Sequence, residues 1–174
     1  MKEIKTYHKN GQLQAHCYRL NGRLIGEYKS WHPNGQLYEH GYFIEPDQMH
    51  GDYKEWYDNG QLASHTHYVN GAFQGEHRQW YSDGKLYRYT EYEKGQRHGE
   101  HKTWHPNGQL AIHAYYAKGE KHGEHKYWCQ DGEFIRHQFW LYNQEVTTEV
   151  DDLVADMYNI TEEERILVRL AIGC

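Results

Sequence analysis

The sequence predicts a mainly β protein, an elongated single-layer meander of antiparallel β-hairpin repeats with two short C-terminal α-helices. The first observation is a tryptophan that recurs at positions 31, 56, 80, 104 and 128. The second is a change of composition after residue 143, where glycine is absent until Gly173 and helix-forming residues take over. We therefore expect a repeat array over residues 1–143 and a helical cap over residues 144–174.

Each tryptophan belongs to a unit of the form G-[ED]-x-[KR]-x-W-x-x-[ND]-G-x-L, present in five copies, the last with Phe134 at the final position. A partial first copy contributes Gly11 and Leu13, and one inserted residue near positions 45–48 is the only change of length. Such regular spacing indicates stacked supersecondary units, so we expect the recurring residues to be structural. They are Trp31, Trp56, Trp80, Trp104, Trp128, Gly35, Gly60, Gly84, Gly108, Gly132, Leu37, Leu62, Leu86 and Leu110.

The turn that follows each tryptophan predicts a hairpin. Pro33-Asn34-Gly35 suits a type I turn followed by a left-handed glycine, which makes a three-residue loop with a bulge. This loop places Trp31 opposite Leu37. A second turn is expected at Asn21-Gly22, Asn70-Gly71, Lys94-Gly95 and Lys118-Gly119.

Side chains alternate along a strand, so this pairing predicts two faces. Trp31, Leu37, Gly41 and Phe43 are expected to share one face, and the same holds for their equivalents in the other units. An opposite-charge ladder, such as Glu27 with Lys29, is expected beside each indole. The small residues at positions 17, 41, 66, 90 and 114 would then lie on the tryptophan face.

The opposite face carries two rows of tyrosine and histidine, which we interpret as a candidate partner-binding surface that responds to pH near 6.5. The alternative is an ordinary solvated strand surface, because both residue types suit β-structure. The first row is Tyr28, Tyr53, His77, His101 and His125, and the second is His32, Tyr57, Tyr81, His105 and Cys129.

Fifteen histidines raise the question of a metal site. Equivalent positions in successive units lie two strands, or roughly 9.6 Å, apart, which is too far for ligands that share one zinc ion. His65 and His67 share one strand face but have no evident third ligand, and no H-E-x-x-H motif is present. An acidic residue follows the first glycine of each of the five units, at Glu27, Asp52, Glu76, Glu100 and Glu124. A catalytic acid needs one distinct environment, so five similar positions argue against catalysis. We expect no catalytic residue, no metal and no cofactor, with a histidine-rich metal protein or enzyme as the alternative.

The composition of the chain indicates which class of partner it binds and in which compartment it is found. Aromatic residues make up 16% of the chain, which argues against wholesale disorder, and the net charge of -6 disfavours nucleic acid. No apolar run approaches the roughly 20 residues that span a bilayer. Cys17, Cys129 and Cys174 have neither a pairable nor a metal-binding spacing, so we expect reduced thiols and a cytoplasmic protein.

The C-terminal cap is predicted to contain two helices. Apolar residues at positions 150, 153, 154 and 157 have helical spacing, and Thr161 with Glu164 forms a capping box before a second apolar helix. These helices would cover the last hairpin or lie on the sheet. Alternatively, a surface of Ile166, Leu167 and Leu170 binds a partner or makes a homodimer.

The repeat unit resembles the MORN repeat (membrane occupation and recognition nexus), in the variant form of bacterial and large-DNA-virus proteins that include YwqK-family antitoxins. The resemblance covers residues 10–142 and rests on Gly26, Trp31, Gly35, Leu37 and their equivalents. It implies a non-catalytic scaffold with a curved single-layer sheet and a groove, which binds proteins and in some cases lipids. Eukaryotic MORN repeats carry Tyr-x-Gly-x-Trp where this chain has Glu-x-Lys-x-Trp. We therefore expect a protein partner, with an antitoxin-like role as one form of it, and treat a membrane-associated scaffold as an alternative that the negative charge disfavours.

Overall fold

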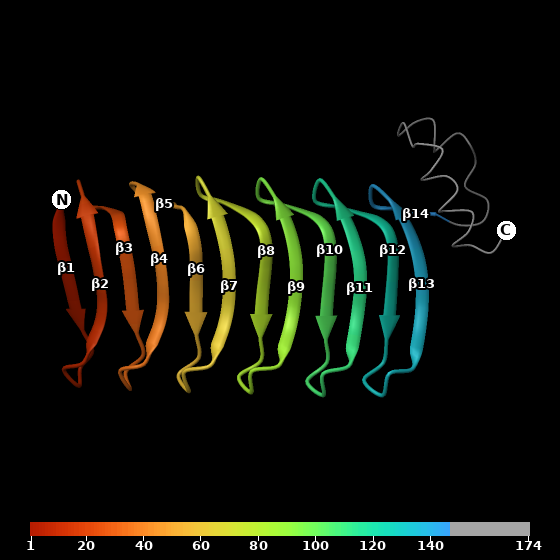
Figure 1. The fold of residues 1–174 in the computed structure, drawn as a ribbon, viewed down its shortest axis with the longest axis horizontal. Helices are drawn as coiled ribbons and strands as arrows, with labels where there is room; N and C mark the ends of the chain where they lie inside the picture. Colours follow the sequence, from red (N-terminus) through yellow and green to blue (C-terminus); the bar gives the residue numbers. More distant parts are fainter. Residues whose placement is uncertain (147–174) are drawn as a thin grey trace.

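The computed structural model describes residues 1–146, which form a single antiparallel sheet of fourteen strands (Figure 1). Neighbours in the sheet follow the order of the chain, except that β5 pairs only with β4. The predicted mainly β meander is confirmed. The two expected helices, with Ile166, Leu167 and Leu170, lie outside the described residues. The strands are β1 (Lys2–Tyr7), β2 (Leu13–Leu20), β3 (Arg23–Trp31), β4 (Leu37–Glu45), β5 (Gln48–Met49), β6 (Gly51–Trp56), β7 (Leu62–Val69), β8 (Ala72–Trp80), β9 (Leu86–Glu93), β10 (Gln96–Trp104), β11 (Leu110–Ala117), β12 (Glu120–Trp128), β13 (Phe134–Leu141) and β14 (Gln144–Val146).

Three-residue turns line one edge of the sheet, the lower edge in Figure 1. In the β3–β4 turn, the His32 amide donates to the Gln36 carbonyl at 2.8 Å, and the Gly35 amide donates to the His32 carbonyl at 2.9 Å. Gly35 has a φ of 87°, which a residue with a side chain rarely adopts. The same two bonds recur in the other units, so the predicted loop is confirmed.

Two-residue turns line the opposite edge. Asn21 and Gly22 both have positive φ, at 50° and 83°, as do Lys94 and Gly95 at 50° and 82°. Two successive left-handed residues define a type I′ turn, whose twist matches that of the flanking strands. The extra residue of the longer unit falls in the same edge, where Asp47 has a φ of 63° beside the short strand β5.

The register of each hairpin slips by one residue just above the three-residue turn. Trp31 lies opposite Leu37 as expected, but the next pair is Ser30 with Glu39, so Tyr38 is an extra residue of β4. The same slip occurs in all six hairpins that carry this turn. It is a β-bulge, and it changes which residues of the second strand share a face with the tryptophan.

This slip corrects the predicted faces. Tyr28 lies directly opposite Gly41, and directly opposed residues share a face. Tyr28 and Trp31 are three residues apart on the same strand, so they point to opposite faces. The predicted grouping of Trp31 with Gly41 and Phe43 is therefore wrong, although its pairing with Leu37 is correct.

The face that carries Tyr28 and Gly41 is called here the packed face. Across it, large side chains from one strand of each hairpin alternate with small ones from the other, so each ring fits over a small neighbour. Most of the small members are buried, Thr90 and Ala114 to 1% exposure. The alternating row runs Cys17, Tyr28, Gly41, Tyr53, Thr66, His77, Thr90, His101, Ala114, His125 and Gln138.

The sheet continues past residue 143. Strand β14 pairs with β13, and Phe139 lies opposite Val146. Phe139, Leu141 and Val146 are all buried, so apolar side chains pack together at this end of the sheet.

Candidate functional site

The first tyrosine and histidine row packs against neighbouring strands of the packed face, where His125 is buried and the other four members are half-buried. His101 Nδ1 lies 2.8 Å from Thr90 Oγ1, and His125 donates from Nε2 to the Tyr115 carbonyl at 2.9 Å. His77 makes the equivalent hydrogen bond to Thr66. His125 is only 1% exposed. These residues hold neighbouring hairpins together, so the row offers less free surface than the sequence suggested.

Burial also changes the protonation of this row. Desolvation, reinforced by nearby arginine and lysine charges, lowers the pKa of His101 and of His125 to about 4. Desolvation lowers the pKa of His77 as well. The expected response to pH near 6.5 is therefore wrong for His101 and His125, which are neutral at that pH, and the pKa of His77 is shifted in the same direction.

The second row binds the neighbouring hairpin along the three-residue-turn edge. His32 Nε2 donates to the Trp56 carbonyl at 2.8 Å, and Tyr57 Oη donates to the Trp80 carbonyl at 2.7 Å. Tyr81 and His105 make the same bond to Trp104 and Trp128. The polar group of each of these four side chains is therefore hydrogen-bonded to the tryptophan carbonyl of the next hairpin. Cys129, the last member of the row, is exposed.

The turn asparagines form a parallel ladder between hairpins. Asn59 Oδ1 accepts the Gln61 amide within its own turn, and Asn59 Nδ2 donates to the Ser82 carbonyl of the next turn at 2.8 Å. Asp83 keeps the first bond but lacks the donor. Lys85 supplies it instead, with Nζ at 3.0 Å from the Pro106 carbonyl. Both polar ladders therefore join hairpins one repeat apart.

The face opposite the packed face is called here the charged face, and most of its carboxylates are paired with a neighbouring base. Glu91, opposite Glu76, instead accepts from Tyr89 Oη and the Glu100 amide. Glu27 Oε1 accepts from Lys29 Nζ at 2.7 Å and lies 3.0 Å from His40 Nε2. The hydrogen bond from Lys29, with a smaller contribution from His40, holds the pKa of Glu27 below its usual range. The predicted opposite-charge ladder is confirmed. The acidic members are Glu3, Glu27, Asp52, Glu76, Glu100 and Glu124.

Two glutamates on the packed face have no such partner. Glu39 and Glu55 lie opposite each other on β4 and β6, and neither forms an ion pair within residues 1–146. Ser30 Oγ donates to Glu39 at 3.0 Å. Desolvation, with the Glu39 charge as a smaller contribution, raises the pKa of Glu55. Burial and the same two carboxylates raise the pKa of Tyr53.

Four cations that have no carboxylate partner among residues 1–146 lie on the packed face between β9 and the β14 end of the sheet. The guanidinium of Arg97 lies 4.0 Å from the Tyr116 ring centroid, and that of Arg136 lies 4.4 Å from the Tyr127 centroid. Lys121 Nζ lies 4.0 Å from the Trp140 ring. Arg88 lies over Tyr87 at 5.2 Å and donates to its hydroxyl. Such contacts leave the charge available to an anion.

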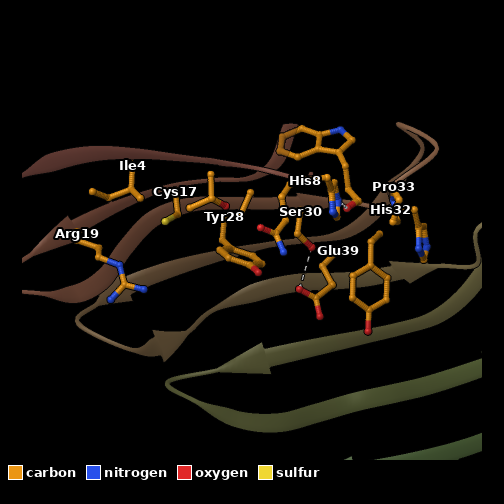
Figure 2. A pocket seen from close by; sticks show the side chains of 14 residues that line it. Ile4, His8, Cys17, Arg19, Tyr28, Ser30, His32, Pro33 and Glu39 are labelled. Carbon is orange, nitrogen blue, oxygen red and sulfur yellow. Dashed lines mark hydrogen bonds between the residues drawn. The ribbon is translucent and has the colours of Figure 1, made fainter. Parts of the chain in front are cut away.

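A groove of about 550 Å³ opens on the packed face over β1–β4 (Figure 2). Cys17, Tyr28, Ser30 and Glu39 project into it from three neighbouring strands, and Figure 2 shows the Ser30–Glu39 hydrogen bond. Tyr38, the extra residue of the bulge, also lines it and is 41% exposed. Its ring lies 4.7 Å from that of His32.

Within the part of the chain that the structure describes, no three His, Cys, Asp or Glu side chains converge as metal ligands. His65 and His67 both contact Asp52, at 3.3 and 2.9 Å. Residues 1–146 contain no helix of the length and apolarity that would cross a membrane.

The sequence reasoning missed Glu39, Glu55 and the unpaired cations of the packed face. A signal for them exists in the sequence. Glu27 is followed two residues later by Lys29, as are most acids of the charged face by a base, whereas Glu39 and Arg88 have no opposite charge two residues away on their strands. Residues two apart share a strand face, so the charges without such a neighbour are the ones left unpaired.

The profile of the MORN repeat variant matches five consecutive segments, residues 2–21, 24–45, 49–70, 73–94 and 97–118. Together these cover more than half of the chain, and each matches one hairpin of the sheet. The chain belongs to the MORN repeat family, whose members are commonly repeat scaffolds that bind proteins or membranes and are typically non-catalytic. A sixth hairpin, β12–β13, repeats the same geometry beyond the matched segments. A comparison with curated proteins gave no match.

Proposed function

We propose that this protein is a non-catalytic scaffold that binds another protein across its packed face. The observation that carries the proposal is the groove over β1–β4, where hydroxyl, carboxylate and aromatic groups meet on an open sheet face. Both turn edges are bound to neighbouring hairpins, through the side chains of the three-residue turns and through the Gly95 amide, which donates to the Phe73 carbonyl. Most carboxylates of the charged face are paired with a base on the same face. The packed face thus has the unpaired charge and the aromatic side chains that protein interfaces favour.

The test compares two exposed tyrosines on opposite faces. Tyr38 lines the groove, and Tyr42, opposite Glu27 on the charged face, is 52% exposed. The full chain is crosslinked to its partners in cells, and partner recovery is measured for Tyr38→Ala and Tyr42→Ala. We expect Tyr38→Ala to reduce partner recovery about tenfold, because an aromatic side chain that becomes buried in an interface contributes on the order of 1.4 kcal/mol or more to binding. Equal losses for both variants, or none, contradict the proposal.

An antitoxin-like role is a narrower form of the same proposal and rests on the resemblance of the repeat unit. Co-purification of a toxin encoded nearby with the intact chain, and its loss in Tyr38→Ala, would support this role, whereas recovery of no such toxin would contradict it. A homodimer through Ile166, Leu167 and Leu170 and a cytoplasmic location also stay proposals, to be tested by sedimentation and by cell fractionation.

A membrane-associated scaffold is the second candidate, because MORN repeats are commonly scaffolds for proteins or membranes. The unpaired cations Arg97, Lys121 and Arg136 favour it over a neutral surface. Flotation with vesicles containing about 30% anionic lipid tests it, and binding that persists in Arg97→Gln/Lys121→Gln speaks against an interaction through this face.

A further inference from the structure

The unpaired charges of the packed face follow an order across the sheet. Residues that lie directly opposite one another on successive strands form a second row across the packed face, between the alternating row and the three-residue turns. It is called here the polar row. Its only charged members are Glu39 and Glu55 near the β1 end, then Arg88 and Arg136 toward the β14 end. The polar row runs Ala15, Ser30, Glu39, Glu55, Ser64, Gln79, Arg88, Thr103, Ile112, Tyr127 and Arg136.

None of these four charges is neutralised inside the described part of the chain. The arginines contact aromatic rings, Glu39 lies opposite Glu55 in the sheet, and Glu39 accepts from the Ser30 hydroxyl. Two buried polar atoms in the centre of the polar row, Gln79 Oε1 and Arg88 Nε, lack a hydrogen-bond partner among the described residues.

Other charges near the row do not reverse this polarity. Arg19 lies at the acidic end but donates to the Gly22 carbonyl at 2.6 Å, near the two-residue turn. Glu145 lies at the basic end and accepts from Gln138. Arg97 and Lys121 lie beyond the alternating row, toward the two-residue turns, and are also positive.

The spacing of the polar row fixes the dimensions of its complement. Strands lie about 4.8 Å apart, so Arg88 is roughly 14 Å and Arg136 roughly 34 Å from Glu55. A sheet face presents side chains and no free backbone groups. An extended peptide would leave its own amides and carbonyls without partners there, whereas a helix satisfies them internally. At about 1.5 Å per residue, roughly 25 helical residues span the row from Glu39 to Arg136.

We propose that the polar row binds an amphipathic helix of a partner protein, laid across the strands, with basic side chains over Glu39 and Glu55 and acidic side chains over Arg88 and Arg136. This proposal rests on the proposed function and adds the chemistry and direction of the partner. Charge complementarity carries it, because the row has two uncompensated carboxylates at one end and uncompensated cations at the other.

The probe is a pair of synthetic helical peptides of about 25 residues with identical composition. In the first, glutamates occupy the N-terminal half and lysines the C-terminal half, which also suits the helix dipole. In the second, the same charges are interleaved. Fluorescence anisotropy against the full chain at low salt is expected to show at least tenfold tighter binding of the first peptide. Equal affinity for the two peptides overturns the proposal.

Matched variants of the full chain test the residues. Glu39→Gln/Glu55→Gln and Arg88→Gln are each expected to weaken the segregated peptide about tenfold. Glu27→Gln/Glu100→Gln removes two carboxylates from the charged face, so it matches the first variant in charge and is expected to leave affinity unchanged. Unfolding curves of all variants verify that they fold. A loss as large in the charged-face variant overturns the assignment to the polar row.

Two further outcomes separate this proposal from the proposed function. If a cellular partner needs Tyr38 but binds the Glu39→Gln/Glu55→Gln variant normally, the proposed scaffold function stands and the proposal of a bound helix is overturned. Self-association of the intact chain, abolished by Glu39→Gln/Glu55→Gln, assigns the row to a second copy and also overturns it.

Discussion

Gly41 provides the sharpest test of how the packed face is built. A Cβ placed on Gly41 would lie 2.6 Å from Cδ2 and 3.3 Å from Cε2 of the Tyr53 ring. Carbon atoms prefer roughly 3.5–4.0 Å, so Gly41→Ala forces the ring to move by about 1 Å. Its φ is ordinary, which means that the backbone accepts alanine without strain.

The expected change in unfolding free energy follows from two opposing effects. Overpacking costs about 1–3 kcal/mol, and the loss of glycine flexibility in the unfolded chain returns about 0.4–1 kcal/mol. We expect a net destabilisation of about 1–2 kcal/mol. Urea unfolding followed by circular dichroism should show a midpoint lower by roughly 0.5–1 M, since m is about 2 kcal/mol/M for a domain of this size.

The repeats supply the control for this experiment. Ala114 already occupies the equivalent position, between His101 and His125. The double variant Gly41→Ala/Tyr53→His reproduces the Ala114–His125 pair and should recover at least about 1 kcal/mol relative to additivity. Unchanged or increased stability of Gly41→Ala, or strict additivity in the double variant, would refute the alternation of large and small side chains as the packing rule.

Three other predictions concern the ladders and the histidines. Asn59→Asp keeps the hydrogen bond from the Gln61 amide but loses the donor to the Ser82 carbonyl. It should destabilise the protein by about 1 kcal/mol, measured as a lower urea midpoint. An unchanged midpoint would show that the asparagine ladder does not stabilise the protein. Tyr57→Phe removes the bond to the Trp80 carbonyl and should cost about 1 kcal/mol, whereas Tyr42→Phe, on an exposed ring, should cost nothing measurable. The folded-state pKa of His125 is lowered to about 4, below the unfolded value near 6.5, so its contribution to stability is complete above pH 6.5 and declines as the pH falls toward 4. Urea midpoints between pH 6.5 and 4.5 should therefore fall less steeply for His125→Gln than for the unchanged chain, and parallel slopes would contradict the burial of this imidazole.

The hairpins could be predicted from the sequence because their turns carry strong local signals. Pro33-Asn34-Gly35 specifies the loop, and Asn21-Gly22 specifies the tight turn, each through backbone conformations that few residues adopt. The period of the tryptophans then fixes the order of the strands. These features depend on residues close in the chain, so a single sequence contains them.

The faces of the second strand of each hairpin could not be predicted, because the bulge at Tyr38 has no such signal. Neither glycine nor proline marks it, and a one-residue slip moves every following side chain to the other face. The small residues at positions 41, 66, 90 and 114 recur opposite the rings, and that size pattern was the available indication of a shared face. The hydrogen bonds of His32 and Tyr57 join residues 23 or 24 positions apart, which no local pattern reports.

The two edge ladders limit how this gene can change in length. On one edge the Asn59 amide reaches the turn of the next hairpin, and on the other the Gly95 amide donates to the Phe73 carbonyl of the preceding one. Loss or duplication of a whole unit preserves the hydrogen bonds between hairpins at both edges. An added or missing residue inside a strand shifts the turns and breaks these hydrogen bonds at both edges. The tolerated insertion lies at Asp47, outside the strands, where its carboxylate still reaches Arg23 and the Leu24 amide. Lineages of this protein should therefore differ in the number of units and hardly at all in the length of each.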